Sequence, residues 1–132
     1  MTQEHPNAAR IRKMFVAFKA ADLATIQETI PEHAIWHFPG RKGKLAGDHQ
    51  GRDEILRFLM NVAGLTNGTF HLDLIDVLAN DHHAVALFHG RGERSGRILD
   101  NPTCLSMRIE NGQVVEVWEF VWDLYHVDEF WS

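Results

Sequence analysis

The chain has 132 residues, 45% of them hydrophobic, and a net charge of −5, which fits one domain over residues 1–132 with a single core. The negative charge argues against a nucleic-acid partner, because neutralising phosphates takes a surplus of Lys and Arg. No apolar stretch is long enough to span a bilayer, and the first residues lack the apolar segment of a secretory signal, so we expect a cytoplasmic protein without a membrane partner. Its single cysteine, Cys104, excludes an internal disulfide, and we expect it to be a small buried side chain that does no chemistry.

The first half of the chain is predicted to be mainly helical. Apolar residues at helical spacing predict a helix over residues 7–21, and Asp22 is a good N-cap for a short second helix that Pro31 ends. A short strand over residues 33–38 is followed by a long, basic, glycine-rich loop over 39–51. A third helix then carries Ile55, Phe58, Leu59 and Val62 at helical spacing.

The second half is predicted to be a run of strands over residues 70–78, 83–94, 103–109 and 113–123. Turn residues separate them, and Asn111-Gly112 is a strong hairpin signal. The tail from Leu124 is expected to cover one edge of the core. Helices followed by a meander of strands predict an α+β domain, in which a curved antiparallel or mixed sheet wraps around the N-terminal helices and forms a cone-shaped pocket.

The closing strand carries a carboxylate in the middle of an aliphatic face. Because side chains alternate between the two faces of a strand, Glu119 shares its face with Val115, Val117 and Val121. A carboxyl group among apolar side chains is expected to face a cavity and to have a raised pKa, which suits general acid–base chemistry. The alternative is a structural carboxylate, paired with a histidine or with an arginine such as Arg91 or Arg108.

The opposite face of the same strand carries three aromatic residues, Trp118, Phe120 and Trp122. Left in water, these rings would form a larger apolar patch than monomers usually expose. The sequence therefore predicts a homodimer built on this face.

His37 is the second catalytic candidate, because a histidine changes charge near neutral pH and can relay a proton to or from Glu119. The alternative is a histidine bonded to backbone at the end of a strand. The nine histidines show no pair with helical metal-ligand spacing, so we expect neither a metal nor a cofactor. Arg41, Lys42 and Lys44 can guide an anion to the pocket or simply form a solvated loop.

Several short motifs in a fixed order resemble the SnoaL-like branch of the nuclear transport factor 2-like superfamily. These motifs are Ala21-Asp22-Leu23, Trp36-His37-Phe38-Pro39-Gly40, Gly51-Arg52-Asp53-Glu54-Ile55, Asn111-Gly112-Gln113-Val114-Val115-Glu116-Val117-Trp118 and Val127-Asp128-Glu129-Phe130-Trp131. The resemblance covers nearly the whole chain and implies a helix-filled cone of sheet. The same fold serves cyclases, isomerases, hydrolases and non-enzymatic binders, so the resemblance does not fix the chemistry.

The resemblance also lets two family chemistries be compared with this chain. Ketosteroid isomerases use a tyrosine and a protonated acid as oxyanion donors, and here Met14 and Leu105 stand at those positions. Polyketide cyclases carry a histidine-tryptophan-aspartate motif, where this chain has Val117-Trp118-Glu119, so a carboxylate is kept and the histidine is lost. We expect the ligand to contact Met14, Phe18, Trp36, Phe38 and Leu105, with a packing role as the alternative for Trp36.

Three readings follow. In the first, the protein is an enzyme or former enzyme that binds a small, largely apolar organic molecule, with Glu119 and His37 moving protons. In the second, the same pocket captures a ligand without catalysis, and in the third the aromatic sheet face is an interaction surface. A polar pair in contact inside the pocket favours the first reading, a wholly apolar pocket the second, and a filled cone the third.

Overall fold

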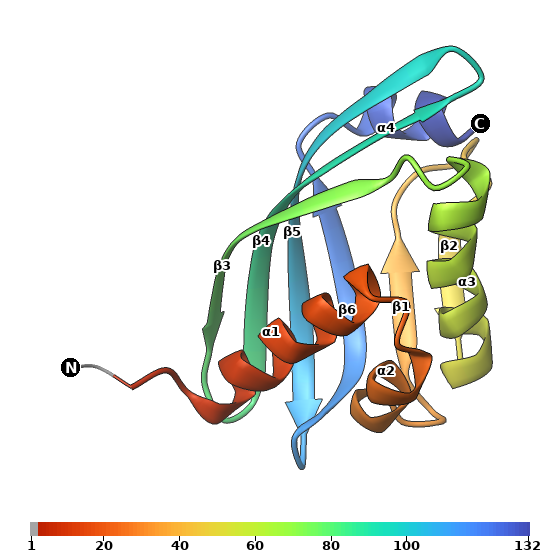
Figure 1. The fold of residues 1–132 in the computed structure, drawn as a ribbon. Helices are drawn as coiled ribbons and strands as arrows, with labels where there is room; N and C mark the ends of the chain where they lie inside the picture. The colour runs from red at the N-terminus through yellow and green to blue at the C-terminus, as the bar shows by residue number, and fades with distance from the viewer. Residues whose placement is uncertain (1–2) are drawn as a thin grey trace.

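A computed structural model of the chain describes residues 3–132. Three helices and two short strands come first, and four longer elements of sheet and a final helix follow (Figure 1). In chain order they are α1 (Pro6–Lys19), α2 (Leu23–Thr29), β1 (Ile35–Phe38), β2 (Gly47–Gln50), α3 (Arg52–Leu65), β3 (His71–Ala79), β4 (His83–Arg94), β5 (Arg97–Glu110), β6 (Gln113–Val121) and α4 (Leu124–Trp131).

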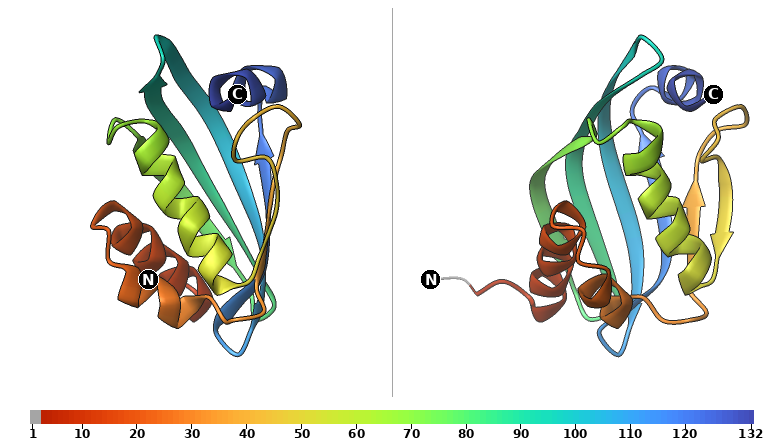
Figure 2. Two further views of the ribbon diagram at one scale, coloured as in Figure 1. Left: turned by 90° about the vertical axis from the view of Figure 1, so that its right-hand side faces the viewer. Right: turned by 45° about the vertical axis from the view of Figure 1, so that its right-hand side comes forward.

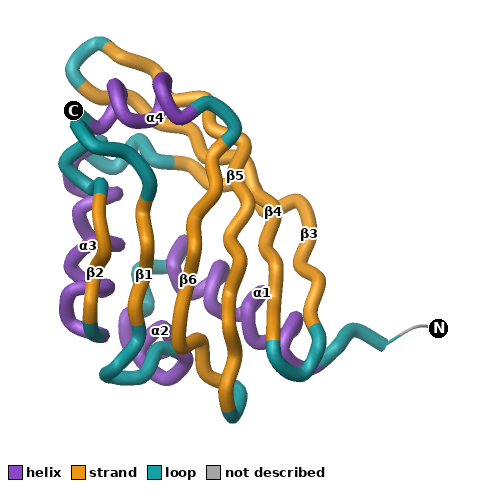
Figure 3. The backbone as a smooth tube through the Cα atoms, turned by 180° about the vertical axis from the view of Figure 1, so that it is seen from behind, coloured by secondary structure: helices purple, strands orange, loops and turns teal. Residues whose placement is uncertain are grey.

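The six strands form one mixed sheet in the order β2-β1-β6-β5-β4-β3, and only β1 and β6 pair in parallel. Helices α1, α2 and α3 cover one face of this sheet (Figure 2). Figure 3 shows the opposite face, with these three helices behind the strands. Helix α4 lies across the end of the sheet where β6 finishes. The predicted α+β class with a curved mixed sheet is therefore confirmed.

The helices begin and end close to where the sequence signals place them. Pro6 occupies the first turn of α1, and the Asp22 side chain accepts the N–H of Thr25 at 3.2 Å as the N-cap of α2. The buried face of α1 carries Ile11, Met14 and Phe15, which pack into the core between helices and sheet. No helix in the described part of the chain, residues 3–132, is both long and apolar enough to cross a membrane.

The structure corrects two predicted segments. The loop predicted over residues 39–51 contains the edge strand β2, which pairs antiparallel with β1 and is polar along its whole length, so it shows no apolar alternation. Strand β5 begins at Arg97 and runs through Pro102 instead of starting after it. The carbonyl of Pro102 accepts the N–H of Trp122, the residue just after the end of β6. The nitrogen of Pro102, which has no hydrogen to donate, points to the same side, where β6 has already ended. The tail, which was expected to cover an edge of the core, forms the helix α4 and buries Val127, Phe130 and Trp131.

A bulge changes which residues of β6 face the core. The register between β5 and β6 shifts at Arg108/Ile109, so Ile109 lies opposite Val114 and Arg108 lies opposite Glu116. Val114 is therefore buried in the core, although strict alternation assigns it to the outer face. From Glu116 onward the alternation holds as predicted, with Val117 and Glu119 facing inward.

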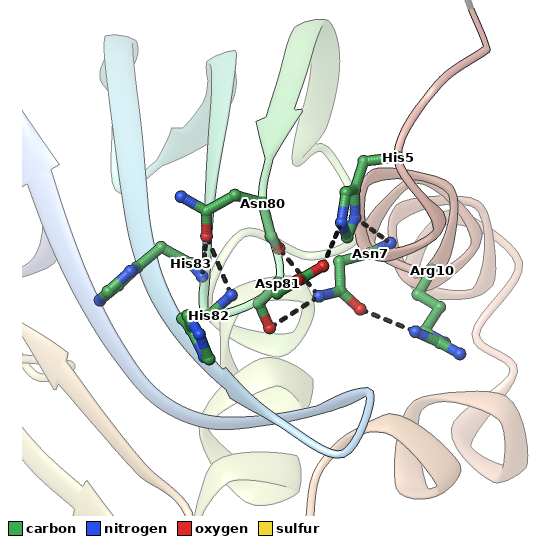
Figure 4. Close-up of polar contacts among 7 residues, drawn as sticks. All are labelled: His5, Asn7, Arg10, Asn80, Asp81, His82 and His83. Atoms are coloured by element: carbon green, nitrogen blue, oxygen red, sulfur yellow. Dashed lines mark hydrogen bonds and ion pairs between the residues drawn. The ribbon is translucent and has the colours of Figure 1, made fainter.

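A polar cluster anchors the start of α1 to the turn between β3 and β4 (Figure 4). The side-chain amide of Asn7 is buried and donates to the carbonyl oxygens of Asn80 and Asp81, while its oxygen accepts from Arg10 at 2.7 Å. His5 also bonds Asp81, at 2.8 Å. Every polar atom of the Asn7 side chain is thus satisfied, as is usual for buried amides.

Candidate functional site

A deep pocket lies between the helices and the inner face of the sheet and encloses about 700 Å³ of empty space, counting its open mouth. The cavity proper is much smaller, about 70 Å³, and the larger figure includes space open to solvent at the mouth. Its wall is almost wholly apolar and unusually rich in aromatic rings, and only two of its residues carry polar side chains other than the indole N–H groups, Glu119 and Asn101. The aromatic members are Phe15, Phe18, Trp36, Phe38, Phe58, Phe70, Phe88 and Trp131.

Glu119 projects from β6 into this pocket, where it lies opposite Leu105 of β5. Its one hydrogen-bond partner in the described residues is the indole of Trp36, whose Nε1–H donates to Oε1 at 3.1 Å. Among residues 3–132, no arginine, lysine or histidine pairs with it: Arg108 instead bonds Glu110 and Glu116, and Arg91 contacts His89. The structural ion pair that was the alternative role for Glu119 is therefore not formed.

This environment changes the acidity of Glu119 strongly. Burial among apolar side chains disfavours the charged carboxylate and raises the pKa of Glu119 from 4.5 to about 7, and the single hydrogen bond from Trp36 only partly opposes this. The carboxyl group can therefore exist in both protonation states near neutral pH, as a general acid–base group requires.

All five residues that we expected to contact the ligand, Met14, Phe18, Trp36, Phe38 and Leu105, line this pocket. Trp36 and Phe38 come from β1 and each packs against Phe58 of α3, with ring centroids 5.4 Å apart in both pairs. These contacts hold the Trp36 indole in place, and so they also orient the N–H that binds Glu119.

The structure does not bring His37 and Glu119 together, and our expectation that they share a ligand is corrected. His37 is next to Trp36 on β1, so its side chain points to the outer face of the sheet. There its Nδ1 bonds Asp48 at 2.7 Å and its Nε2 bonds Glu116 at 2.6 Å, while the ring stacks on Trp118. The hydrogen bond to Glu116 is the main reason why the pKa of His37 is raised and that of Glu116 is lowered.

Asn101 is a site residue that the sequence analysis missed. Its side chain lines the pocket from β5 and is only 5% exposed, yet its Oδ1 has no hydrogen-bond partner in the described residues. Leaving a buried amide oxygen unpaired costs about 1–3 kcal/mol. The residue lies in the part of β5 before Pro102 that was not predicted as strand, so no alternation pointed to an inward side chain.

One carboxylate of α4 holds the basic loop that follows β1. Asp128 accepts the backbone N–H groups of Arg41, Lys42 and Gly43 at 2.7 to 3.0 Å, and the N–H of Lys44 donates to the carbonyl of Trp131 at 2.8 Å. Gly40 has a φ of 108°, and a Cβ there would collide with the Asp128 carboxylate. The basic loop is therefore fastened to the helix that supplies Trp131 to the pocket wall.

The cysteine lies away from the pocket, and the histidines of the described residues do not form a metal site. Cys104 is half-buried on the outer face of the sheet opposite Phe120, and burial raises the pKa of its thiol, which makes it less reactive. Within residues 3–132, no three His, Cys, Asp or Glu side chains cluster in a way that could hold a metal ion.

Comparison with known proteins agrees with this architecture. Residues 11–117 match the model of the SnoaL-like domain, and the chain belongs to that family, within the nuclear transport factor 2-like fold. An uncharacterized protein of Mycobacterium tuberculosis is 30% identical over 123 residues, which are 92% of this chain and 93% of the relative.

Solved structures give the same result. A protein encoded on a soil-derived mobile gene cassette superposes with a TM-score of 0.91 at 38% identity, covering 96% of both chains. IdmH, a candidate polyketide cyclase from Streptomyces antibioticus, superposes with a TM-score of 0.75 at 20% identity, covering 93% of this chain and 96% of its own. At that identity the likeness to the candidate cyclase is one of fold.

Proposed function

We propose that the protein binds a small, largely apolar organic molecule in the pocket and transfers a proton to or from it through Glu119. The observation that carries this proposal is a carboxyl group with a pKa of about 7, fixed by Trp36 in an apolar cavity. A polar pair in contact inside the pocket is the feature that favours an enzyme over a passive binder. IdmH, a candidate polyketide cyclase of the same fold, supports a reaction of the cyclase type.

The reaction that suits this site begins at an acidic C–H or O–H of the ligand. The carboxylate form of Glu119 accepts the proton, and the carboxylic acid that results can return it to another atom of the same molecule. The apolar walls keep bulk water away from the exchange, and the Trp36 N–H stabilises the charged form between turnovers. His37 takes no part, because it lies on the other face of the sheet.

The test is exchange of the α-protons of 2-tetralone, a bicyclic ketone, in deuterated buffer, followed by NMR. We expect the wild-type protein to accelerate exchange above buffer, with a rate that rises as the pH passes through about 7. Glu119→Gln should lower the protein-dependent rate about 100-fold or more, which is typical of losing a general base. The control is Glu116→Gln, a carboxylate on the outer face of the same strand, which should keep the wild-type rate.

If Glu119→Gln exchanges the probe as fast as wild type, Glu119 is not the base. If the wild-type protein binds 2-tetralone but does not speed its exchange, the alternative reading of a non-catalytic binding module is favoured. That alternative rests on the rest of the wall, which is apolar apart from Asn101.

We also propose that two copies associate through the outer sheet face. Phe120 and Trp122 are 58% and 84% exposed there, and Trp118 lies beside them under the His37 ring. Phe120 lies opposite Cys104, which lies opposite Leu87, so the apolar surface continues across three strands. Covering such a patch is favourable at about 25 cal/mol per Å² of apolar area, before the costs of association.

Sedimentation velocity at micromolar concentration measures this association. We expect the wild-type protein to sediment as a dimer and the double variant Phe120→Glu, Trp122→Glu as a monomer, because charges in the contact would be buried without partners. Val16→Glu, on the exposed side of α1, is the matched control and should remain dimeric. A wild-type monomer across this concentration range contradicts the proposal.

A further inference from the structure

Four polar side chains in the described part of the chain are buried, and Asn101 differs from the other three. Asn7 bonds two carbonyls and Arg10, and the hydroxyls of Thr66 and Thr103 donate to backbone carbonyls at 2.8 and 3.2 Å. The oxygen of Asn101 has no partner among residues 3–132. The other three buried polar side chains are satisfied within the protein. The unpaired oxygen of Asn101 lies in the pocket wall, where a ligand can donate a hydrogen bond to it.

The position of Asn101 relative to Glu119 defines the shape of that ligand. Glu119 lies opposite Leu105, and Asn101 is four residues before Leu105 on β5, with both side chains facing the pocket. Four residues of strand span about 13 Å. The two polar groups of the pocket are therefore at separate ends, and aromatic side chains such as Phe15 and Phe88 form the wall between them.

We infer that Asn101 is a specificity residue that binds a hydroxyl or carbonyl group at the far end of a flat, aromatic ligand whose reacting end lies at Glu119. The amide offers an acceptor and a donor, so it can bond either group. The ligand class is thus an elongated aromatic or polycyclic molecule of at least two fused rings with an oxygen substituent at each end. This inference rests on the proposed function for the position of the reacting end.

The inference is tested by isothermal titration calorimetry with two probes, 2,6-dihydroxynaphthalene and naphthalene. The main variant is Asn101→Leu, which keeps the size of the side chain and removes its polar atoms. We expect it to lower the affinity for the dihydroxy probe about tenfold, the effect of one lost hydrogen bond, and to change the affinity for naphthalene less than twofold. The control is Thr103→Val, whose hydroxyl is already bonded to backbone and should not affect either probe.

A second readout separates a ligand-binding role from a structural one. Because the amide oxygen has no partner to lose, Asn101→Leu should melt at the same temperature as the wild-type protein or higher. A lower melting temperature together with an equal loss of affinity for both probes shows a structural residue and overturns the inference.

Failure of the inference is distinguishable from failure of the proposed function. If Asn101→Leu binds both probes as the wild type does while Glu119→Gln still abolishes exchange of 2-tetralone, only the role of Asn101 is overturned. If neither probe binds the wild-type protein while exchange of 2-tetralone still depends on Glu119, the inferred ligand class is overturned and the proposed function stands.

Discussion

Glu119→Gln is expected to stabilise the folded protein at pH 7 to 8 and to leave its stability unchanged near pH 4. The pKa of Glu119 is about 7 in the folded protein against an ordinary value of 4.5, so between these pH values the folded state keeps a proton that the unfolded state releases. The free energy of unfolding therefore falls as pH rises through this window, by on the order of 3 kcal/mol in total. Glutamine resembles the protonated acid and does not ionise, so the free energy of unfolding of the variant lacks this decrease with pH.

Thermal unfolding of both proteins between pH 4 and pH 8 measures the effect. The two melting temperatures should coincide at low pH and separate as pH rises, with the glutamine variant more stable. Glu116→Gln is the control of opposite sign: His37 holds the pKa of Glu116 low, so losing this carboxylate should reduce stability at neutral pH. A glutamine variant at position 119 that melts well below wild type at pH 7 would show that Glu119 is a structural ion-pair residue.

Asp128→Ala is expected to destabilise the protein by about 2 kcal/mol, because several charge-assisted hydrogen bonds to one carboxylate are lost together. Burial alone would raise the pKa of the Asp128 carboxyl group. The hydrogen bonds from the N–H groups of Gly43, Arg41 and Lys42 outweigh this effect and hold the pKa below its ordinary value. Its contribution is therefore complete at neutral pH and is lost only as pH falls through that lowered pKa. The loss should also loosen Trp131, and with it the binding of ligands in the pocket.

Chemical denaturation measures this change, and Glu129→Ala is the matched control, because it removes the neighbouring exposed carboxylate, whose side chain makes no hydrogen bond in the described residues. The control should stay within about 0.5 kcal/mol of wild type, as for most surface substitutions. Equal stability of the two alanine variants would contradict the role of Asp128 as the fastening of the loop.

The structural features that the sequence predicted correctly are local, and each has a direct physical cause. Asp22 caps α2, β4 runs over residues 83–94, and Asn111 and Gly112 both adopt positive φ in the hairpin turn that this pair favours. The inward position of Glu119 could be predicted because alternation along a strand depends only on its own residues. These features need no knowledge of distant parts of the chain.

What could not be predicted depends on pairing between segments far apart in sequence. Strand β2 is polar and becomes a strand only because β1 lies beside it. Val114 turns inward because of a bulge against β5. Alternation with Trp36 already places His37 on the outer face, but its partners there, Glu116 and Trp118, follow from the parallel pairing of β1 with β6. Asn101 was missed because Pro102 suggested that no strand continued there, although the proline nitrogen faces the end of β6.

The most direct test of the central claim is the titration of Glu119 itself. In protein labelled with ¹³C at the glutamate carboxyl, the Glu119 signal is assigned by its absence from the Glu119→Gln spectrum and followed from pH 3 to pH 9. The structure predicts a midpoint of about 7, well above the ordinary value of 4.5. A midpoint at or below 4.5 would show that the carboxyl group is solvated or paired with a cation, and it would contradict acid–base chemistry at this site.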